Sequence, residues 1–127
     1  MRKLILIFSH SLTDKQIEDS KVNLYINEFI YLPKELQGKW SLIPPDMEDI
    51  SNITDEIKDW IDSVADKDDY ILVQGDFGAT YDVVKHLKNK GHRVIYSTTS
   101  RRAKEIVRDD GKIEITHIFD HVMYREY

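Results

Sequence analysis

Residues 70–81 have the sequence YILVQGDFGATY, and this stretch decides the fold. Its apolar run ends at Val73, the chain breaks at Gly75, and an amphipathic segment then extends to Gly91. A strand, a tight glycine turn and a helix start leave amide N–H groups of the first helical turn unpaired, where the helix dipole favours negative charge. An α/β protein usually holds a phosphate or a ribose at such a turn. The Gly-x-x-Gly spacing matches neither a dinucleotide-binding nor a Walker fingerprint. The alternative interpretation is a strand-to-helix turn that uses glycine only for its backbone conformation.

The composition is that of one globular domain covering residues 1–127, with 32% charged and 41% hydrophobic residues. No apolar run approaches the roughly 20 residues that span a bilayer, so no membrane partner is expected. The apolar start of the chain is interrupted at Ser9 and does not resemble a signal peptide. The chain has no cysteine, which excludes a disulfide framework and a thiol nucleophile and favours a cytoplasmic location.

The net charge of −5 is unevenly distributed along the chain. Ten acidic residues lie between Asp46 and Asp69, whereas eight Lys or Arg and one Glu lie between Lys85 and Arg108. A basic surplus close to the glycine turn could attract a small polyphosphate, but it is too short and mixed for a DNA duplex. Solvated helix and hairpin faces are the alternative interpretation.

Strand and helix patterns alternate along the chain and predict an α/β fold. The expected elements are a strand at Lys3–Phe8, a helix at Asp14–Val22 capped by Thr13 and Gln16, a strand at Glu28–Leu32, a helical turn at Pro33–Trp40, an amphipathic helix within Ile50–Val64, a strand at Tyr70–Gln74, a helix at Phe77–Lys90, a strand at Arg93–Tyr96 and a β-hairpin within Ile106–Ile115. This order predicts a single Rossmann-like domain with a mostly parallel sheet, flanking helices and a C-terminal hairpin.

Ligands of parallel sheets bind beyond the carboxyl ends of the strands, and three polar segments are expected there. They consist of Ser9, His10 and Ser11, then Gln74, Gly75, Asp76, Phe77, Gly78, Ala79 and Thr80, and finally Ser97, Thr98 and Thr99 followed by Arg101 and Arg102. We expect these segments to converge and to bind a ligand that contains phosphate.

Each segment has an expected role and a plainer alternative. The amides from Gly75 to Ala79 and the Thr80 hydroxyl would hold a phosphate or ribose, while Asp76 would cap the helix or accept from a ribose hydroxyl. The Ser-Thr-Thr segment, residues 97–99, would contact ribose or phosphate, or cap the end of a strand. No metal or other cofactor is expected, because His117 and His121 have the spacing of zinc ligands on a helix but fall in a predicted strand and tail.

Basic side chains provide the candidates for catalysis. Arg101 and Arg102 could form bidentate contacts with phosphate oxygens, or could be a solvated pair. His10 is the candidate general acid or base because histidine titrates near physiological pH, and the alternative is a packing role.

Five segments carry a resemblance to a known family. They are Phe8–Thr13, Tyr31–Gln37, Val73–Tyr81, Tyr96–Thr99 with Arg101-Arg102, and Thr116–Val122. Together they resemble small CRISPR-associated accessory proteins of type III systems, the ring nuclease class. The resemblance implies a CARF-related domain that binds cyclic oligoadenylate, most simply cyclic tetra-adenylate, and linearises this antiviral messenger.

Ring opening of such a messenger requires neither metal nor covalent nucleophile. Each ribose 2′-OH lies next to its own phosphate, so holding it in line with the leaving 5′-oxygen is enough to give a 2′,3′-cyclic phosphate. Two alternatives stay open: a binder that sequesters the messenger without cutting it, and a nucleotide-binding or interaction module whose basic stretch docks a protein. The approximate two-fold symmetry of cyclic tetra-adenylate favours a homodimer with the ligand across its axis.

Overall fold

The computed structural model describes all 127 residues and shows an α/β fold. The elements, in chain order, are β1 (Lys3–Ile7), α1 (Asp14–Asn23), β2 (Glu28–Tyr31), α2 (Lys34–Ser41), α3 (Ser51–Val64), β3 (Tyr70–Val73), α4 (Phe77–Asn89), β4 (Arg93–Val107) and β5 (Ile113–Glu126). The sheet order is β2-β1-β3-β4-β5, with β1 to β4 parallel and β5 antiparallel to β4. The predicted fold class is therefore confirmed.

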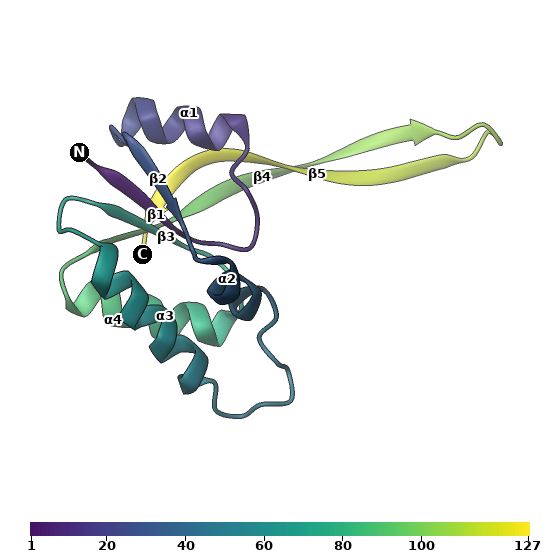
Figure 1. Ribbon diagram of the computed structural model, residues 1–127. Coiled ribbons are helices and arrows are strands. Elements are labelled where there is room, and N and C mark those ends of the chain that lie inside the picture. Colours follow the sequence, from purple (N-terminus) through teal and green to yellow (C-terminus); the bar gives the residue numbers. More distant parts are fainter.

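Helices cover both faces of the sheet, with α1 on one face and α2, α3 and α4 on the other (Figure 1). The larger core lies under the three helices, where Ile57 and Ile61 of α3 are fully buried against β1 and β3. A smaller core lies under α1 and includes Leu4 and Leu6 of β1. Because β1 is covered on both sides, it reads as an unbroken apolar run.

The start of α1 follows the sequence prediction. The Gln16 amide donates to the Thr13 hydroxyl at 3.3 Å, and the Thr13 amide donates to the Gln16 side chain at 2.9 Å. This is the reciprocal capping box expected from the two residues. It fixes where the chain enters α1 after leaving β1.

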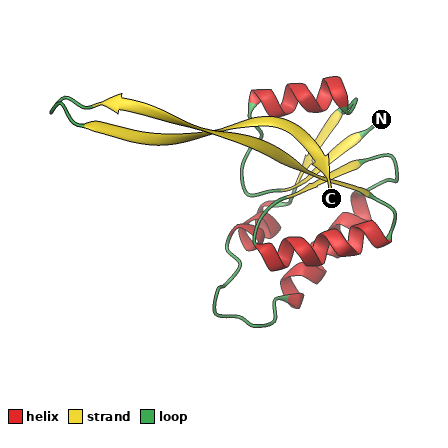
Figure 2. Cartoon of the chain, turned by 180° about the vertical axis from the view of Figure 1, so that it is seen from behind, coloured by secondary structure: helices red, strands yellow, loops and turns green.

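Strand β4 is much longer than predicted. It was expected to end at Tyr96 but extends to Val107, so the polar segment from Ser97 to Arg102 is strand and not a loop. With β5 it forms a two-stranded ribbon that projects beyond the rest of the protein (Figure 2). We call residues 100–120 of this ribbon the arm. The predicted hairpin turn is confirmed: the Arg108 amide donates to the Lys112 carbonyl at 2.8 Å, and Gly111 supplies a φ of +82°.

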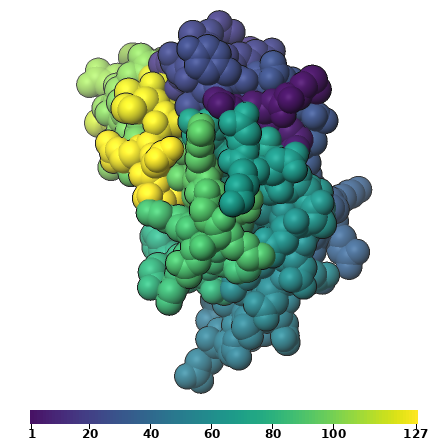
Figure 3. Space-filling model, turned by 90° about the vertical axis from the view of Figure 1, so that its left-hand side faces the viewer, coloured from purple at the N-terminus to yellow at the C-terminus, as the bar shows by residue number.

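Ion pairs close the amino-terminal edge of the sheet, which faces the viewer in Figure 3. Arg2 pairs with Asp68 at 3.0 Å, and Lys3 pairs with Asp66 at 2.8 Å and with the buried Asp69 at 3.0 Å. Burial alone would raise the pKa of Asp69, but hydrogen bonds from the Asp66 and Lys3 amides and from the Lys3 ammonium outweigh it and hold the pKa below its usual value. No helix is both long and apolar enough to cross a bilayer.

Candidate functional site

The carboxyl ends of β1 and β3 form the position where this topology usually places a ligand. The two strands are neighbours at the centre of the sheet, and the chain leaves β1 toward α1 on one face and β3 toward α4 on the other. Diverging connections of this kind open a crevice between them. The residues at this position are Ser9 and His10 after β1 and the turn from Gln74 to Gly78 after β3.

A pocket of about 310 Å³ lies beside this turn. It is lined by Gln74, Gly75, Phe77, Thr80, Tyr96 and Tyr127. The Phe77 ring is 95% exposed, an unusual state for a phenylalanine. The rings of Tyr96 and Tyr127 pack together with centroids 4.7 Å apart. The pocket is therefore rich in aromatic surface, which suits a flat ring system.

The C-terminal residue Tyr127 forms one wall of the pocket, a role that the sequence analysis missed. Its amide donates to the Val94 carbonyl at 3.0 Å and its hydroxyl donates to the Val73 carbonyl at 2.5 Å. Burial, with a contribution from Tyr96, raises the pKa of the Tyr127 hydroxyl, so it remains a donor at neutral pH. No local pattern marks this residue, because both partners lie far away in the sequence.

The first turn of α4 is only partly available to an anion. The Asp76 carboxylate accepts from the Ala79 amide at 3.0 Å, and the Thr80 amide donates to the Asp76 carbonyl at 2.8 Å. The helix-capping role expected for Asp76 is thus present. Of the five amides from Gly75 to Ala79 in the predicted cradle, only that of Ala79 is occupied, and the other four have no partner.

Gly75 serves packing within the core. A Cβ at this position would lie 2.7 Å from Nε1 and 2.8 Å from two ring carbons of Trp40, which is 2% exposed. The Trp40 indole N–H donates to the Gln74 carbonyl at 3.0 Å, which holds the ring against the turn. The close approach that requires glycine is therefore that of Trp40.

Thr80 carries an unsatisfied polar atom at the pocket. Its hydroxyl oxygen is buried and has no hydrogen-bond partner, although the residue lines the pocket. Buried hydroxyls without a partner are uncommon, and each one requires an explanation. Because the atom itself is buried, a ligand oxygen in the pocket reaches it only after the Thr80 side chain rotates.

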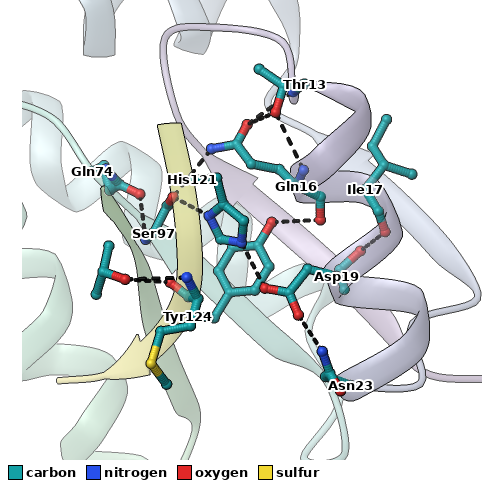
Figure 4. A network of polar contacts seen from close by, with 12 residues as sticks. Thr13, Gln16, Ile17, Asp19, Asn23, Gln74, Ser97, His121 and Tyr124 are labelled. Carbon is teal, nitrogen blue, oxygen red and sulfur yellow. Dashed lines mark hydrogen bonds and ion pairs between the residues drawn. The ribbon is translucent and has the colours of Figure 1, made fainter. Parts of the chain in front are cut away.

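On the α1 side of the sheet, Ser97 belongs to a buried polar network (Figure 4). Its amide donates to the Gln74 side chain at 2.8 Å, and its hydroxyl lies 2.6 Å from Nδ1 of His121. Nε2 of His121 lies 2.6 Å from the Asp19 carboxylate. Since the carboxylate can only accept, Nε2 carries a proton, and in the neutral tautomer Ser97 donates to Nδ1.

Ser97, His121 and Asp19 are the residue types of a hydrolytic triad, but a substrate cannot reach them. Ser97 is 7% and His121 5% exposed, and neither lines a pocket. A nucleophile must reach its substrate, so we assign the network to positioning the start of the arm against α1. The expected contact of Ser97 with ribose or phosphate does not fit its burial.

The other predicted site residues lie apart from the pocket. Thr98 bonds the Met123 backbone across the ribbon at 3.0 Å, and Thr99 is exposed. Arg102 pairs with Asp120 at 2.8 Å, and the Arg101 guanidinium lies 5.9 Å from the Phe119 ring centre.

The two arginines do not reach the glycine turn within one chain. Arg101 is five residues beyond Tyr96 along β4, a separation of about 16 Å. The predicted convergence of the three polar segments is therefore wrong for the arginines. Its physical reason is the continuation of β4, which carries both side chains outward along the arm.

The loop after β1 remains open to solvent. His10 is exposed, and its ring contacts the edge of Phe8 with centroids 5.4 Å apart. Ser9 is half-buried and Ser11 is exposed, and neither hydroxyl makes a hydrogen bond. Imidazole and hydroxyl groups at this position are free to contact a bound molecule.

A second cavity, of about 320 Å³, lies on the other side of the glycine turn. It is lined by Ile43, Pro44, Pro45, Met47, Glu48, Ile50, Asp76 and Gly78. The start of α4 therefore has a hollow on each side.

No group of three or more His, Cys, Asp or Glu side chains is arranged to hold a metal ion.

Comparison with known proteins gives a family. The family model described as "Uncharacterized protein MJ1673 family" matches residues 2–125. The chain is 52% identical over 127 residues to "Uncharacterized protein MJ1673" of Methanocaldococcus jannaschii, which covers 100% of this chain and 98% of that protein. No solved structure matches the chain.

Proposed function

The chain belongs to the MJ1673 family, and we propose that it binds a cyclic oligoadenylate at the carboxyl edge of its sheet and opens the ring. The observation that carries this proposal is where two of the resembling segments lie. Gln74, Gly75, Phe77 and Thr80 come from residues 73–81 and Tyr96 from residues 96–99, and all five line one pocket. Two segments that are 15 residues apart in the sequence, from Tyr81 to Tyr96, thus form one surface.

Aromatic side chains supply the means to bind adenine. A base stacked on the exposed Phe77 ring would bury apolar surface that now faces water. Stacking of this kind contributes about 1–3 kcal/mol per base. The packed rings of Tyr96 and Tyr127 supply a rigid second wall, so little entropy is lost when the base enters.

Polar groups at the start of α4 suit ribose and phosphate, although Asp76 and Gly78 face the second cavity. Asp76 would repel a phosphate but can accept from a ribose hydroxyl. The four unpaired amides from Gly75 to Gly78 can donate to phosphate oxygens, and the Thr80 hydroxyl can do so once its side chain rotates toward the pocket. A nucleotide needs both kinds of group, and the start of α4 has both.

Ring opening would use the messenger's own 2′-OH. The 2′-OH gives up its proton as the 2′-oxygen forms a bond to the adjacent phosphorus, the bond to the 5′-oxygen breaks, and the 5′-oxygen takes up a proton to leave as a hydroxyl. The exposed His10 is the candidate to transfer the proton. The proposal does not rest on Arg101 or Arg102, since neither reaches the pocket of its own chain. It includes a homodimer and a cytoplasmic location, where such a messenger would act.

Sequestration without cleavage is the second candidate, and one observation favours it. No histidine, lysine, arginine, aspartate or glutamate side chain lines the aromatic pocket. A pocket without a group that titrates near neutral pH can bind a messenger tightly and leave it intact. Binding is common to both candidates, and turnover separates them.

The test combines calorimetry with product analysis. Cyclic tri-, tetra- and hexa-adenylate are titrated into the protein, and each is also incubated with it in excess EDTA and analysed by mass spectrometry. We expect binding of one ring size and linear products ending in 2′,3′-cyclic phosphate. Phe77→Ala should weaken binding by about tenfold or more, since a lost stacking contact is worth 1–3 kcal/mol. Tyr25→Ala, at an aromatic side chain that is 72% exposed before β2, should leave binding unchanged.

The outcomes separate the candidates. An intact messenger that binds tightly would assign sequestration. Loss of turnover in EDTA would replace the 2′-OH mechanism by metal-assisted hydrolysis. Absence of binding to all three rings would overturn the proposal.

A further inference from the structure

The two faces of the arm differ in chemistry. The pairing of Arg101 with Phe119, Ala103 with His117, Glu105 with Ile115 and Val107 with Ile113 places these eight residues on one side, which we call the apolar arm face. Its four large apolar residues, Val107, Ile113, Ile115 and Phe119, are 60–72% exposed. The opposite side carries two ion pairs, Arg102 with Asp120 and Arg108 with Glu114, both at 2.8 Å, together with Lys104, Thr116, Ile106 and Ile118.

The arm has no support from its own chain along this face. Beyond His121, which packs under α1, the ribbon projects away from the helices (Figure 2). An isolated two-stranded hairpin is at best marginally stable in water, and a third strand or a packing surface is normally needed. A row of exposed apolar side chains on such a ribbon marks an interaction surface.

We propose that the apolar arm face packs against the same face of a second copy of this chain. Arg101 and Glu105 lie on the same strand, two residues before and two residues after Ala103. A two-fold axis at Ala103, perpendicular to the strands, sets Arg101 of each copy opposite Glu105 of the other. The same operation sets Phe119 opposite Ile115. The central rungs, from Arg101 to Glu105 and from Ile115 to Phe119, are thus self-complementary, as an isologous interface requires, whereas Val107 and Ile113 lie opposite Thr99 and His121 of the other copy.

The charges of the arm favour a copy over a nucleic acid. Arg102 and Arg108 are neutralised by their partners on the opposite face. Arg101 and Glu105 take part in no ion pair within the chain and balance each other on the apolar arm face. A surface without net charge does not attract a phosphate backbone, whereas alternating charges select a complementary surface.

The size of the face predicts a weak dimer. About this axis six residues a side face their counterparts, against about 20–30 residues a side in a standard interface. We therefore expect reversible dimerisation that depends on protein concentration. This interface does not depend on the proposed ligand, and it is measured without any nucleotide, so either proposal can fail alone.

Charge exchange tests the pairing. Sedimentation of the full chain across a concentration series should show a monomer–dimer equilibrium. Arg101→Glu and Glu105→Arg should each weaken it by about a hundredfold, because each places like charges opposite each other twice per dimer. The double variant should restore dimerisation. Lys104→Glu makes the same charge change on the opposite face and should leave the equilibrium unchanged.

Crosslinking gives a second readout that does not rest on charge. The chain has no cysteine, so Ala103→Cys introduces a single thiol on the predicted axis. A short bis-maleimide, suited to sheets packed about 10 Å apart, should then link two chains, whereas Lys104→Cys should not crosslink. Circular dichroism confirms that each variant is folded. A wild-type monomer up to about 1 mM, a double variant that stays monomeric, or equal crosslinking at both positions would overturn the proposal.

Discussion

Replacing Gly75 with alanine should destabilise the protein through one defined clash. The added Cβ would lie 2.7–2.8 Å from three atoms of the Trp40 indole, distances that real Cβ atoms do not adopt. Trp40 cannot move away easily, because it is 2% exposed within the main core and its N–H is bonded to Gln74. Overpacking of a core costs about 1–3 kcal/mol, and loss of the indole hydrogen bond adds about 1 kcal/mol.

The expected loss is therefore about 2–4 kcal/mol, which lowers the Tm by about 8–15 °C in a domain of this size. Differential scanning calorimetry of Gly75→Ala measures it. Gly38→Ala is the matched control, since nothing lies within 4 Å of a Cβ at this helical position, and it should raise the free energy of unfolding by about 0.5–1 kcal/mol. In the background of Trp40→Phe, which shortens the ring, Gly75→Ala should cost less. Strictly additive effects of the two substitutions would refute the clash.

Three further predictions concern buried polar groups. His121→Ala removes the imidazole partner of the Ser97 hydroxyl and of the Asp19 carboxylate, which keep only Gln16 and Asn23, and it leaves a cavity under α1, so urea denaturation should show a loss of about 2–4 kcal/mol; an unchanged midpoint would contradict the assigned network. The pKa of Asp69 is lower in the folded protein than in the unfolded chain, so its ionised carboxylate stabilises the fold above the ordinary carboxyl pKa. This stabilisation is lost as the pH falls through the folded-state pKa. Asp69→Asn should therefore lower the Tm at pH 7 but much less near pH 3. Tyr127→Phe removes one hydrogen bond to a backbone carbonyl and should lower the free energy of unfolding by about 1 kcal/mol in the same urea assay. An unchanged free energy of unfolding would show that water in the unfolded state satisfies the hydroxyl equally well.

The parallel part of the fold follows from local patterns in the sequence. A strand that is buried on both faces reads as an apolar run, and Lys3–Ile7 has one. The cap at Thr13 and the apolar period of the helix that ends at Val64 are equally local. Such signals depend on neighbours within a few residues, so one sequence is enough to recognise them.

The end of β4 depends on a distant partner and could not be recognised in the same way. The segment from Ser97 to Arg102 has polar residues on both sides of the ribbon, so it lacks the alternation that marks a half-buried strand. It is a strand because it pairs with residues 118–124. Nothing in the sequence near Ser97 indicates that these residues are its partners.

Distant partners also explain the residues of the site that were missed or reassigned. Gly75 is required by Trp40, which lies 35 residues earlier in the chain. The wall formed by Tyr127 arises only when the C-terminus returns beside β4. His121 was considered for zinc, but its partner Asp19 is 102 residues away and its ring points under α1.

A β-bulge allows one strand to serve both the body and the arm. Thr98 pairs with Met123 and Thr99 pairs with His121, so Val122 has no partner in β4. Residues three apart in a regular strand point to opposite faces, yet His121 and Tyr124 both lie under α1, with ring centroids 4.6 Å apart. The extra residue brings both side chains to the same face. From His121 toward the arm, every second residue of β5 points to the same face as His121. Phe119 and Ile115 therefore lie on one side of the arm. The buried network and the apolar arm face thus have a common structural cause, an unpaired residue at the point where the arm leaves the sheet.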